Sequence, residues 1–386
     1  MRNVLCVINV ADKMKEPFNP FVINTYQGKE YFCDRENDLE MLISHIENDR
    51  NVVLYAWRRL GKSALIHRLF DELESSQNYE TLYIDLLATQ NIDEAIQTIS
   101  AAIYQKYGKT SGGISASIQK LLASIGATIS FNPISGTPEL TLGVNKSEQP
   151  RQSLAALGEF LLSRKKRIVI AIDEFQQIND YEGEKAEAVF RAWVQQIPEV
   201  RFIFSGSHRT LMEDMFTEKK RPFYQSSMLE SLQPISLEAY TEFIIQHFQA
   251  AKKTIEAESI AKIYTWSRGQ TYTVQLVCNH LFSNYKKVTN ADVDTVFNQI
   301  LVQQQAIYAN FQKMLTRTQW NVFRAIAKEE PLQNPLSKDF LQKHKLGAAS
   351  TVSTALKALE RLELVIKDEG NYLVHEVQLA RWMARL

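Results

Sequence analysis

The stretch Val-Val-Leu-Tyr-Ala-Trp-Arg-Arg-Leu-Gly-Lys-Ser, residues 52–63, indicates the fold of this chain. Its first four residues are apolar and include two β-branched valines, which is typical of a strand buried inside a sheet. Residues 64–74 predict a helix that ends in the polar residues 75–78. Residues 56–63 are therefore expected to form a loop that leads from a buried strand into a helix.

This loop matches the second half of the phosphate-binding pattern G-x-x-x-x-G-K-[ST], which requires a strand before it and a helix after it. Backbone N–H groups of the loop and of the helix start would surround phosphate oxygens, because the helix dipole favours negative charge there. Lys62 would contact the β- and γ-phosphates, and the Ser63 hydroxyl would bind Mg²⁺. The expected nucleotide contacts are Ala56, Trp57, Arg58, Arg59, Leu60, Gly61, Lys62, Ser63 and Ala64.

Ala56 departs from the pattern, which has a glycine at this position. If the backbone there needs a positive φ, alanine costs about 1 kcal/mol. Such a cost would weaken nucleotide binding without abolishing it.

A second motif supports nucleotide binding. Residues 168–172 are all apolar and are followed by Asp173 and Glu174, so two acids stand at the end of a buried strand. Asp173 would hold Mg²⁺ through its water shell, and Glu174 would act as general base on the attacking water. The alternative is that two acids simply end a strand at the surface. The loop at residues 56–63 makes nucleotide binding the better interpretation.

Hydrolysis also needs groups that respond to the γ-phosphate and neutralise charge in the transition state. Ser207, in the Ser-Gly-Ser turn after a further apolar strand, is the candidate γ-phosphate sensor. The candidate arginines are Arg58, Arg59, Arg209 and Arg221. The expected catalytic set is Lys62, Glu174, Ser207 and Arg209.

The order of elements predicts the fold class. Strands alternate with helices up to about residue 236, which is typical of an α/β fold with a parallel sheet covered on both faces. Two alternating stretches around a Pro- and Gly-containing turn predict a β-hairpin inserted at about residues 126–145. A helix–turn–helix followed by a hairpin predicts a C-terminal winged helix. The expected divisions are a ragged N-terminus (1–18), a P-loop NTPase domain (19–236), an all-α domain (237–312) and a winged-helix domain (313–386).

The winged-helix region has features for and against DNA binding. Residues 311–386 contain 12 Lys and Arg against 8 Asp and Glu, a net charge of about +4. A helix that starts at a Ser350 cap would turn polar side chains outward, but the wing carries Asp368 and Glu369, which would repel phosphates. DNA contact and docking to a partner therefore both remain open. The candidate DNA contacts are Thr351, Ser353, Thr354, Lys357 and Arg361.

The composition, with 45% hydrophobic and 23% charged residues, is that of an ordinary globular protein. Lys and Arg total 44, as do Asp and Glu, so nucleic-acid contact would need a local patch.

Cys6, Cys33 and Cys278 lack CxxC spacing, which argues against a disulfide framework or a zinc site. No apolar run approaches the roughly 20 residues that span a bilayer, and the short apolar patch after Met1 lacks a clear cleavage site. We expect a cytoplasmic protein.

Six motifs together resemble the archaeal-type ATPases of the STAND group, within the AAA+-like P-loop class. The resemblance extends over roughly residues 19–386 and includes the inserted hairpin. The six motifs are Phe32–Glu36, Arg58–Ser63, Ile172–Gln176, Phe204–Ser207, Arg221–Gln225 and Trp266–Thr271.

The resemblance implies a strand between the loop strand and the Asp173 strand, a helical lid at residues 237–312 and a C-terminal winged helix. It also implies that Tyr31, Phe32 and Arg35 contact the adenine, and that Gly269 in the lid touches the base. Two positions depart from the family. The family's usual glycine before Arg35 is Asp34 here, and the lid's Gly-x-Pro turn ends in Thr271.

Two functions follow from these patterns. The first is an ATP-binding and ATP-hydrolysing switch, using ATP/ADP and Mg²⁺, whose lid and winged helix control a partner; in STAND proteins the winged helix often packs on the ATPase domain to hold the off state. The second is a winged-helix DNA-binding regulator in which nucleotide is a structural or sensing ligand. No acceptor-site signature favours a kinase, and no Asn-Lys-x-Asp motif favours guanine over adenine.

Overall fold

The computed structural model describes residues 17–110, 113–131, 138–142, 149–182 and 185–386. The chain divides into two compact units. The first, here called the sheet unit, runs from Asp34 to Gln233, and the second, here called the helical unit, joins the residues up to Cys33 with Pro234–Leu386. Most of the predicted ragged N-terminus, up to residue 16, lies outside the described residues.

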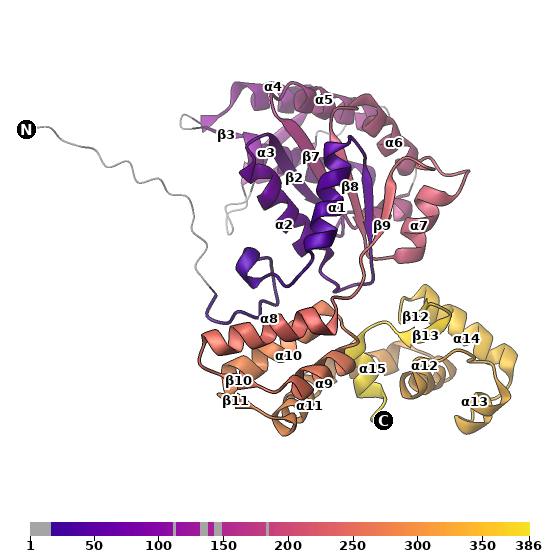
Figure 1. The fold of residues 1–386 in the computed structure, drawn as a ribbon. Coiled ribbons are helices and arrows are strands. Elements are labelled where there is room, and N and C mark those ends of the chain that lie inside the picture. Colours follow the sequence, from indigo (N-terminus) through magenta and orange to yellow (C-terminus); the bar gives the residue numbers. More distant parts are fainter. Residues whose placement is uncertain (1–16, 111–112, 132–137, 143–148, 183–184) are drawn as a thin grey trace, which may run out of the picture. The chain divides into compact units, whose positions relative to one another are not determined.

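A five-stranded parallel sheet forms the centre of the sheet unit (Figure 1). β8 lies between β1 and β7, so the strand expected between the loop strand and the Asp173 strand is present. The predicted α/β class with a parallel sheet is confirmed. The strands, in spatial order, are β2 (Tyr79–Asp85), β7 (Arg167–Asp173), β8 (Arg201–Gly206), β1 (Val52–Tyr55) and β9 (Met228–Ser231).

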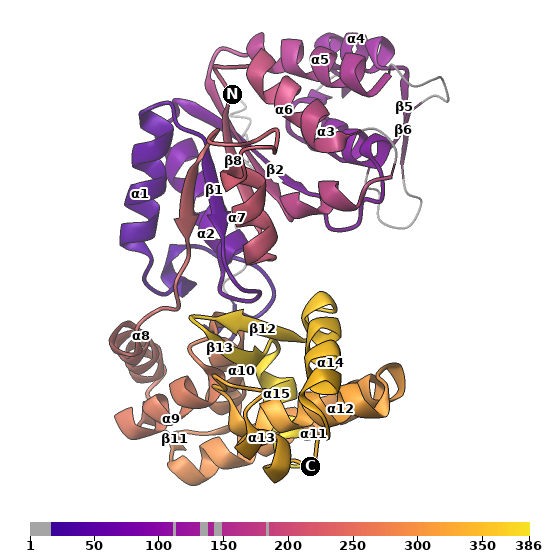
Figure 2. The same ribbon diagram turned by 90° about the vertical axis from the view of Figure 1, so that its right-hand side faces the viewer.

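Helices cover both faces of this sheet because side chains along each strand alternate between the faces. Val53 and Tyr55 belong to a large apolar core that contains residues of α3 to α7 and none of α1 or α2. Figure 2 shows α1 and α7 on opposite sides of the sheet. The helices are α1 (Glu36–Glu47), α2 (Lys62–Ser75), α3 (Ile92–Tyr107), α4 (Ala116–Ser124), α5 (Gln149–Leu162), α6 (Ala186–Gln196) and α7 (Arg209–Thr217), with a 3₁₀ helix, η2 (Phe175–Asp180).

The hairpin predicted at about residues 126–145 corresponds to β5 (Ala127–Phe131) and β6 (Pro138–Leu142), which pair antiparallel. Its turn, residues 132–137, and residues 143–145 lie outside the described residues. A second, shorter hairpin precedes it, formed by β3 (Lys109–Thr110) and β4 (Gly113–Ile114).

One predicted strand is displaced. A further short strand is expected around residues 232–235, but the last strand of the sheet, β9, spans Met228–Ser231. Leu232 donates its N–H to the Tyr55 carbonyl at 3.0 Å as the chain leaves the sheet, and Ile235 belongs to the core of the helical unit. Leu232 and Ile235 are buried, but Pro234 between them has no N–H to donate to a neighbouring strand.

Within the helical unit, the first apolar core is formed by the helices after Ser236 together with Phe21 from the N-terminal segment. Two short parallel strands, absent from the prediction, join this part: β10 (Thr254–Ile255) and β11 (Lys287–Val288). The helices are α8 (Leu237–Ala250), α9 (Ala257–Ser267), α10 (Thr271–Asn284) and α11 (Asn290–Met314), with the 3₁₀ helix η1 (Lys29–Tyr31).

The second core of this unit belongs to the winged helix, and α11 enters both cores. Val296 and Ile300 lie in the first core, while Leu301 and Tyr308 lie in the second. One continuous helix therefore joins the predicted lid to the winged helix. The winged helix comprises α12 (Arg317–Glu329), α13 (Lys338–Lys343), α14 (Ala349–Arg361), β12 (Val365–Asp368), β13 (Asn371–Val374) and α15 (Val377–Met383).

Two local features of the winged helix follow from its turns. The wing turn places Glu369 at φ 47° and Gly370 at φ 85°, the backbone of a two-residue hairpin turn whose twist matches the strands. The cap of α14 is Ala348, without a side-chain cap, so the expected Ser350 cap is wrong. Gly347 at φ 83° turns the chain early enough for the helix to begin before Ser350.

Candidate functional site

The loop at residues 56–63 connects β1 to α2 at the carboxyl edge of the sheet. Positive φ angles occur at Arg59 (67°) and Gly61 (95°), whereas Ala56 is absent from the described residues with positive φ. Ala56 is buried, and its N–H donates to the Gly206 carbonyl at 3.4 Å. The cost expected for alanine at this position therefore does not arise.

Lys62 folds back over the loop. Its Nζ donates to the Ala56 carbonyl at 3.2 Å, and the residue is only 6% exposed. Burial lowers the pKa of Lys62, while the nearby carboxylates of Glu174 and Asp173 act in the opposite direction. A buried ammonium enclosed by loop backbone is a suitable partner for a phosphate oxygen, because an anion would compensate its lost hydration.

Asp173, at the end of β7, accepts hydrogen bonds from three hydroxyls. Ser63 Oγ donates to Oδ2 at 2.7 Å, Ser205 Oγ donates to Oδ1 at 2.6 Å, and the Tyr83 hydroxyl donates to Oδ2. Burial alone would raise the pKa of Asp173, but the bonds from Ser205, Tyr83 and Ser63, with the charge of Lys62, together hold it below its ordinary value. The structure thus keeps an ionised carboxylate beside the loop.

Glu174 follows directly and has a left-handed backbone (φ 51°). Its Oε2 accepts a hydrogen bond from Ser207 Oγ at 2.7 Å and a second one from Gln176 Nε2. Arg58 Nε donates to the same Ser207 hydroxyl at 3.4 Å. The predicted base and the predicted γ-phosphate sensor are therefore in direct contact, beside a loop arginine.

The other candidate arginines differ in their surroundings. The Arg209 guanidinium, at the start of α7, lies 5.8 Å from the Tyr55 ring centre and 6.0 Å from the Trp57 ring centre, so it flanks the loop. Arg59 is exposed on the loop. Arg221 instead pairs with Glu187 at 3.0 Å, so a carboxylate of the sheet unit already offsets its charge.

Arg35 lies buried at the start of α1, where its guanidinium contacts the loop backbone. It donates to the Leu60 carbonyl at 3.2 Å and to the Gln233 carbonyl at 2.6 Å. The preceding Asp34 has φ 55° and Arg35 has φ 81°, a backbone that glycine adopts without steric cost. The positive φ at position 34 explains why a glycine suits this position. The hydrogen bond to the Leu60 carbonyl means that Arg35 supports the backbone of the phosphate-binding loop.

Comparison with known families agrees with this geometry. Residues 32–277 match the family described as an ATPase domain predominantly from Archaea. The chain belongs to this ATPase family. Residues 306–385 match a probable winged helix domain. Among curated protein sequences, no match was found.

Solved structures show the same fold for the archaeal-type ATPase described here. The Walker-type ATPase Paby2304 of Pyrococcus abyssi is 17% identical, with a TM-score of 0.65 over 95% of this chain and 100% of that chain. The ORC2 protein of Aeropyrum pernix, in ADPNP–ADP complexes, is 14% identical, with a TM-score of 0.58 over 95% of this chain and 97% of that one. The ORC1 protein of Aeropyrum pernix, in complex with DNA, is 12% identical, with a TM-score of 0.53 over 95% and 96%.

Three predicted nucleotide contacts of this ATPase belong to the helical unit. Tyr31 stacks on His247 with ring centres 6.2 Å apart, and the Phe32 ring meets Tyr26 edge-on at 5.7 Å. Gly269 has φ 66°, and a Cβ added there would come within 3.0 Å of the Tyr264 ring. These residues are placed within their own unit, and their role at the base stays a prediction.

Sequence reasoning missed Tyr83, and it did not link Ser205 to Asp173 or Gln176 to Glu174, although both lie in motifs that it named. Tyr83 lies on β2, which pairs with β7 so that Asp85 is level with Asp173. The signal in the sequence was the hydroxyl of Tyr83, two residues before the end of β2, the strand beside β7. It becomes informative only when the strand order is known.

The oxygens of Ser63 and Asp173 fit Mg²⁺, because this ion prefers oxygen ligands and keeps several waters beside one or two protein groups. In the described part of the ATPase, no three His, Cys, Asp or Glu side chains gather as an all-protein metal cage. In the same residues, no helix is both long and apolar enough to cross a membrane.

Proposed function

We propose that this ATPase is an ATP-binding and ATP-hydrolysing switch of the STAND, AAA+-like kind, in which nucleotide repositions the lid and winged helix to control a partner. The observation that carries the proposal is a buried ion-pair cluster inside the helical unit. It joins Arg268, the neighbour of the predicted base contact Gly269, to Glu330 and Arg381 of the winged helix.

Glu330 is the centre of this cluster, and its side chain is only 3% exposed. Arg268 Nη1 lies 3.6 Å from one carboxylate oxygen, and Arg381 Nη1 lies 3.3 Å from the other. The Val374 N–H donates to Glu330 at 3.0 Å, and Arg268 Nη2 donates to the Val374 carbonyl at 2.7 Å. A buried carboxylate that serves two guanidiniums and a backbone amide makes a specific, costly-to-break junction.

This junction links the turn after α9 to the strand β13 and to the end of α12. Arg381 adds bonds to the Trp266 carbonyl at 2.9 Å and the Thr265 carbonyl at 3.5 Å. Since α11 also enters both cores, movement of the Gly269 turn would carry the winged helix with it. A nucleotide that contacts Gly269 would thereby shift the winged helix, which would carry the surface that binds a partner.

The hydrolytic chemistry follows from the sheet unit. We assign water activation to Glu174, which would accept a proton as the water attacks the γ-phosphorus and the bond to the β–γ bridging oxygen breaks. Lys62 and Arg209 would offset charge at the phosphates. Bound Mg²⁺, held by Ser63 and through water by Asp173, would supply further charge neutralisation. Because Ser207 bonds Glu174, a sensor that moves toward a phosphate would release the base.

Hydrogen exchange of the full-length protein tests the switch. We expect ATP and ADP to give different protection in residues 317–383, with the ATP pattern held in Glu174→Gln, which retains ATP. Lys62→Ala, which removes the phosphate contact, is the control and must show neither pattern. Identical protection with ATP and ADP in the winged helix contradicts the proposal.

A second test concerns the Glu330 junction. We expect Glu330→Gln to weaken the ATP–ADP difference in the winged helix while ATP hydrolysis continues, because the substitution removes the charge between the two arginines and one of the two acceptor oxygens. Glu376→Gln, also in the winged helix but outside the ion pairs of Glu330, is the matched control. If the ATP–ADP difference in protection of the winged helix is undiminished in Glu330→Gln, the coupling does not depend on the ion pairs of Glu330.

The second candidate is a DNA-binding regulator in which nucleotide acts as a structural or sensing ligand. The supporting observation is the outer side of α14, where Thr351, Thr354, Lys357 and Arg361 are exposed and Ser353 is half-buried. The fold is shared with an Aeropyrum pernix ORC1 structure in complex with DNA. We expect Lys357→Glu with Arg361→Glu to abolish a salt-dependent shift of duplex DNA if this reading is right; no shift at low salt removes it.

The proposal also includes a cytoplasmic location. Cys33 and Cys278 are buried cysteines outside any disulfide bond, which suits a reducing compartment. Fractionation of cells that express the tagged protein tests this.

A further inference from the structure

A basic hollow lies at the edge of the sheet opposite the nucleotide site. β7 begins at Arg167 and ends at Asp173, and β8 begins at Arg201 and ends at Gly206. Because the two strands are parallel, Arg167 and Arg201 share the amino edge while Asp173 and Gly206 share the carboxyl edge. The hollow at the amino edge has a volume of about 660 Å³.

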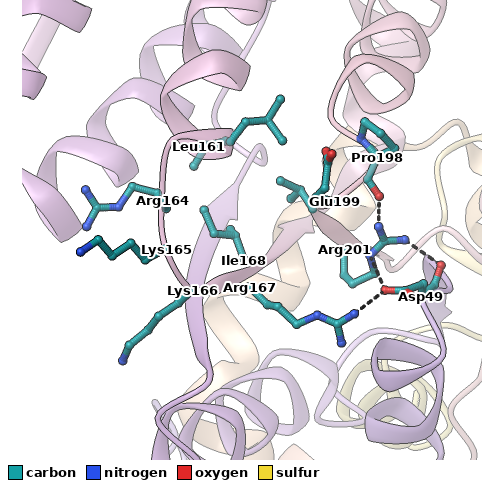
Figure 3. Close-up of a pocket in the computed structure, with 12 residues that line it drawn as sticks. Asp49, Leu161, Arg164, Lys165, Lys166, Arg167, Ile168, Pro198, Glu199 and Arg201 are labelled. Atoms are coloured by element: carbon teal, nitrogen blue, oxygen red, sulfur yellow. Dashed lines mark hydrogen bonds and ion pairs between the residues drawn. The ribbon is translucent and has the colours of Figure 1, made fainter.

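Five cations line this hollow against two acids. Four of the cations are consecutive, in the segment that leads from α5 into β7 (Figure 3). None of them takes part in the chemistry assigned to the nucleotide site. The cations are Arg164, Lys165, Lys166, Arg167 and Arg201, and the acids are Asp49 and Glu199.

The arginines are held in place by the protein. Arg167 pairs with Asp49 at 3.0 Å, and Arg201 donates to the Asp49 carbonyl at 2.7 Å. Burial lowers the pKa of the Arg201 guanidinium, which stays charged and has lost part of its hydration. One carboxylate thus serves two guanidiniums, so the hollow keeps a positive excess.

The lysines are held differently. Lys165 and Lys166 are exposed, and within the described residues neither takes part in an ion pair. Arg164, beside them, rests on the Tyr107 ring at 4.5 Å and lies 3.6 Å from Glu80. The hollow therefore combines arginines that pair with protein groups and two exposed lysines at its rim.

The directions of these side chains distinguish between ligands. In Figure 3, Arg164 and Lys165 extend to one side, Lys166 extends away from both, and Arg167 and Arg201 meet at Asp49 on the other side. Charges that surround one compact anion would converge on a point, and these do not. A chain of regularly spaced phosphates suits the spread arrangement.

The uncharged part of the lining is aliphatic, from Leu161, Leu162, Ile168, Pro198 and Val200. It offers no aromatic face on which a base could stack. Recognition there would depend on phosphates and not on base identity. We propose that this hollow binds the phosphate backbone of a nucleic acid without reading its sequence, on the face of the sheet unit opposite the nucleotide site.

Fluorescence anisotropy of the full-length protein with a labelled duplex DNA of mixed sequence tests the proposal. We expect Lys165→Glu with Lys166→Glu to lower the affinity by at least roughly tenfold. We also expect the slope of log K against log salt to fall in magnitude by roughly 2, since each phosphate contact contributes about 0.9. Two sequences of equal length must bind with similar affinity.

The matched control is Lys219→Glu with Lys220→Glu, an exposed adjacent pair in the same unit. It has the same change in net charge and should keep nearly full affinity. The Lys357→Glu, Arg361→Glu background separates this surface from the winged helix, because two independent surfaces give additive losses. ATP hydrolysis should be unchanged in Lys165→Glu, Lys166→Glu, and this activity also shows that the variant is folded.

Three outcomes overturn the proposal. They are full DNA affinity in Lys165→Glu, Lys166→Glu, an equal loss in the control pair, and binding of a polyglutamate peptide at this hollow with no binding of DNA. None of these outcomes would contradict the proposed ATP-dependent switch, because that proposal depends on the nucleotide site and on Glu330.

Discussion

The two edges of the parallel sheet carry charge in opposite ways. At the carboxyl edge, Asp173 is buried and accepts three hydroxyl donors, and Lys62 lies 6% exposed against loop backbone. At the amino edge, Lys165 and Lys166 extend outward without ion pairs among the described residues. Buried, oriented charge is what phosphoryl chemistry needs, whereas exposed charge is enough to hold a polyanion.

The largest expected effect lies at the carboxyl edge. Glu174→Gln keeps the size and hydrogen bonding of the side chain but removes the base, so we expect ATP hydrolysis to fall by roughly 10²- to 10⁴-fold. ATP binding, measured by calorimetry, should remain. Glu218→Gln, exposed after α7, is the control. Hydrolysis at the control's rate in Glu174→Gln would remove Glu174 from the mechanism.

The next effect concerns the support of Asp173. Tyr83→Phe removes one of its three hydroxyl donors, and we expect the free energy of unfolding to fall by about 1.5–3 kcal/mol, the range for a hydrogen bond to a charged group. Urea unfolding measures this. Tyr224→Phe, half-buried in the same unit, is the comparison variant. Equal stability of Tyr83→Phe and the parent chain would mean that Ser63 and Ser205 suffice.

A smaller effect of opposite sign is expected at the amino edge. Asp49→Asn removes the carboxylate charge that offsets Arg167 and Arg201, while asparagine tolerates the left-handed backbone at φ 57°. We expect DNA affinity to rise about threefold, measured by anisotropy, with ATP hydrolysis unchanged. Weaker DNA binding would indicate that Asp49 orders the arginines more than it opposes their charge.

The smallest effect tests the loop itself. Ala56→Gly restores the glycine of the phosphate-binding pattern, yet Ala56 does not have a positive φ. We expect the ATP dissociation constant to change by less than about twofold. An improvement of about fivefold, equivalent to about 1 kcal/mol, would mean that the bound loop adopts the strained backbone that the sequence pattern implies.

Much of the nucleotide site could be located from the sequence. The loop, the acids Asp173 and Glu174, and Ser207 each follow a buried apolar strand, and parallel strands place their carboxyl ends together. The structure brings Ser63 to Asp173 and Ser207 to Glu174. Local pattern and strand direction were sufficient because Asp173, Glu174 and Ser207 lie at or next to a strand end, and the loop that carries Ser63 starts directly after β1.

Other contacts could not be found that way. Arg35 reaches the Leu60 carbonyl across 25 positions, and Tyr83 reaches Asp173 across 90. The basic hollow joins Asp49, residues 164–167 and Arg201, which no spacing rule connects. The strand expected around residues 232–235 lies slightly earlier in the chain, as β9, because Pro234 has no N–H to pair in a sheet.

The sequence by itself determined the alternation of strands and helices, the loop and its acids, and the winged-helix pattern at the C-terminus. These depend on side-chain periodicity and on residues near one another in the chain. The tertiary structure decided which hydroxyls surround Asp173, how Glu330 joins Arg268 to Arg381, and that one edge of the sheet is basic. Those features arise where strand order and helix packing bring distant residues together, and that order is set by the whole core and not by any one segment.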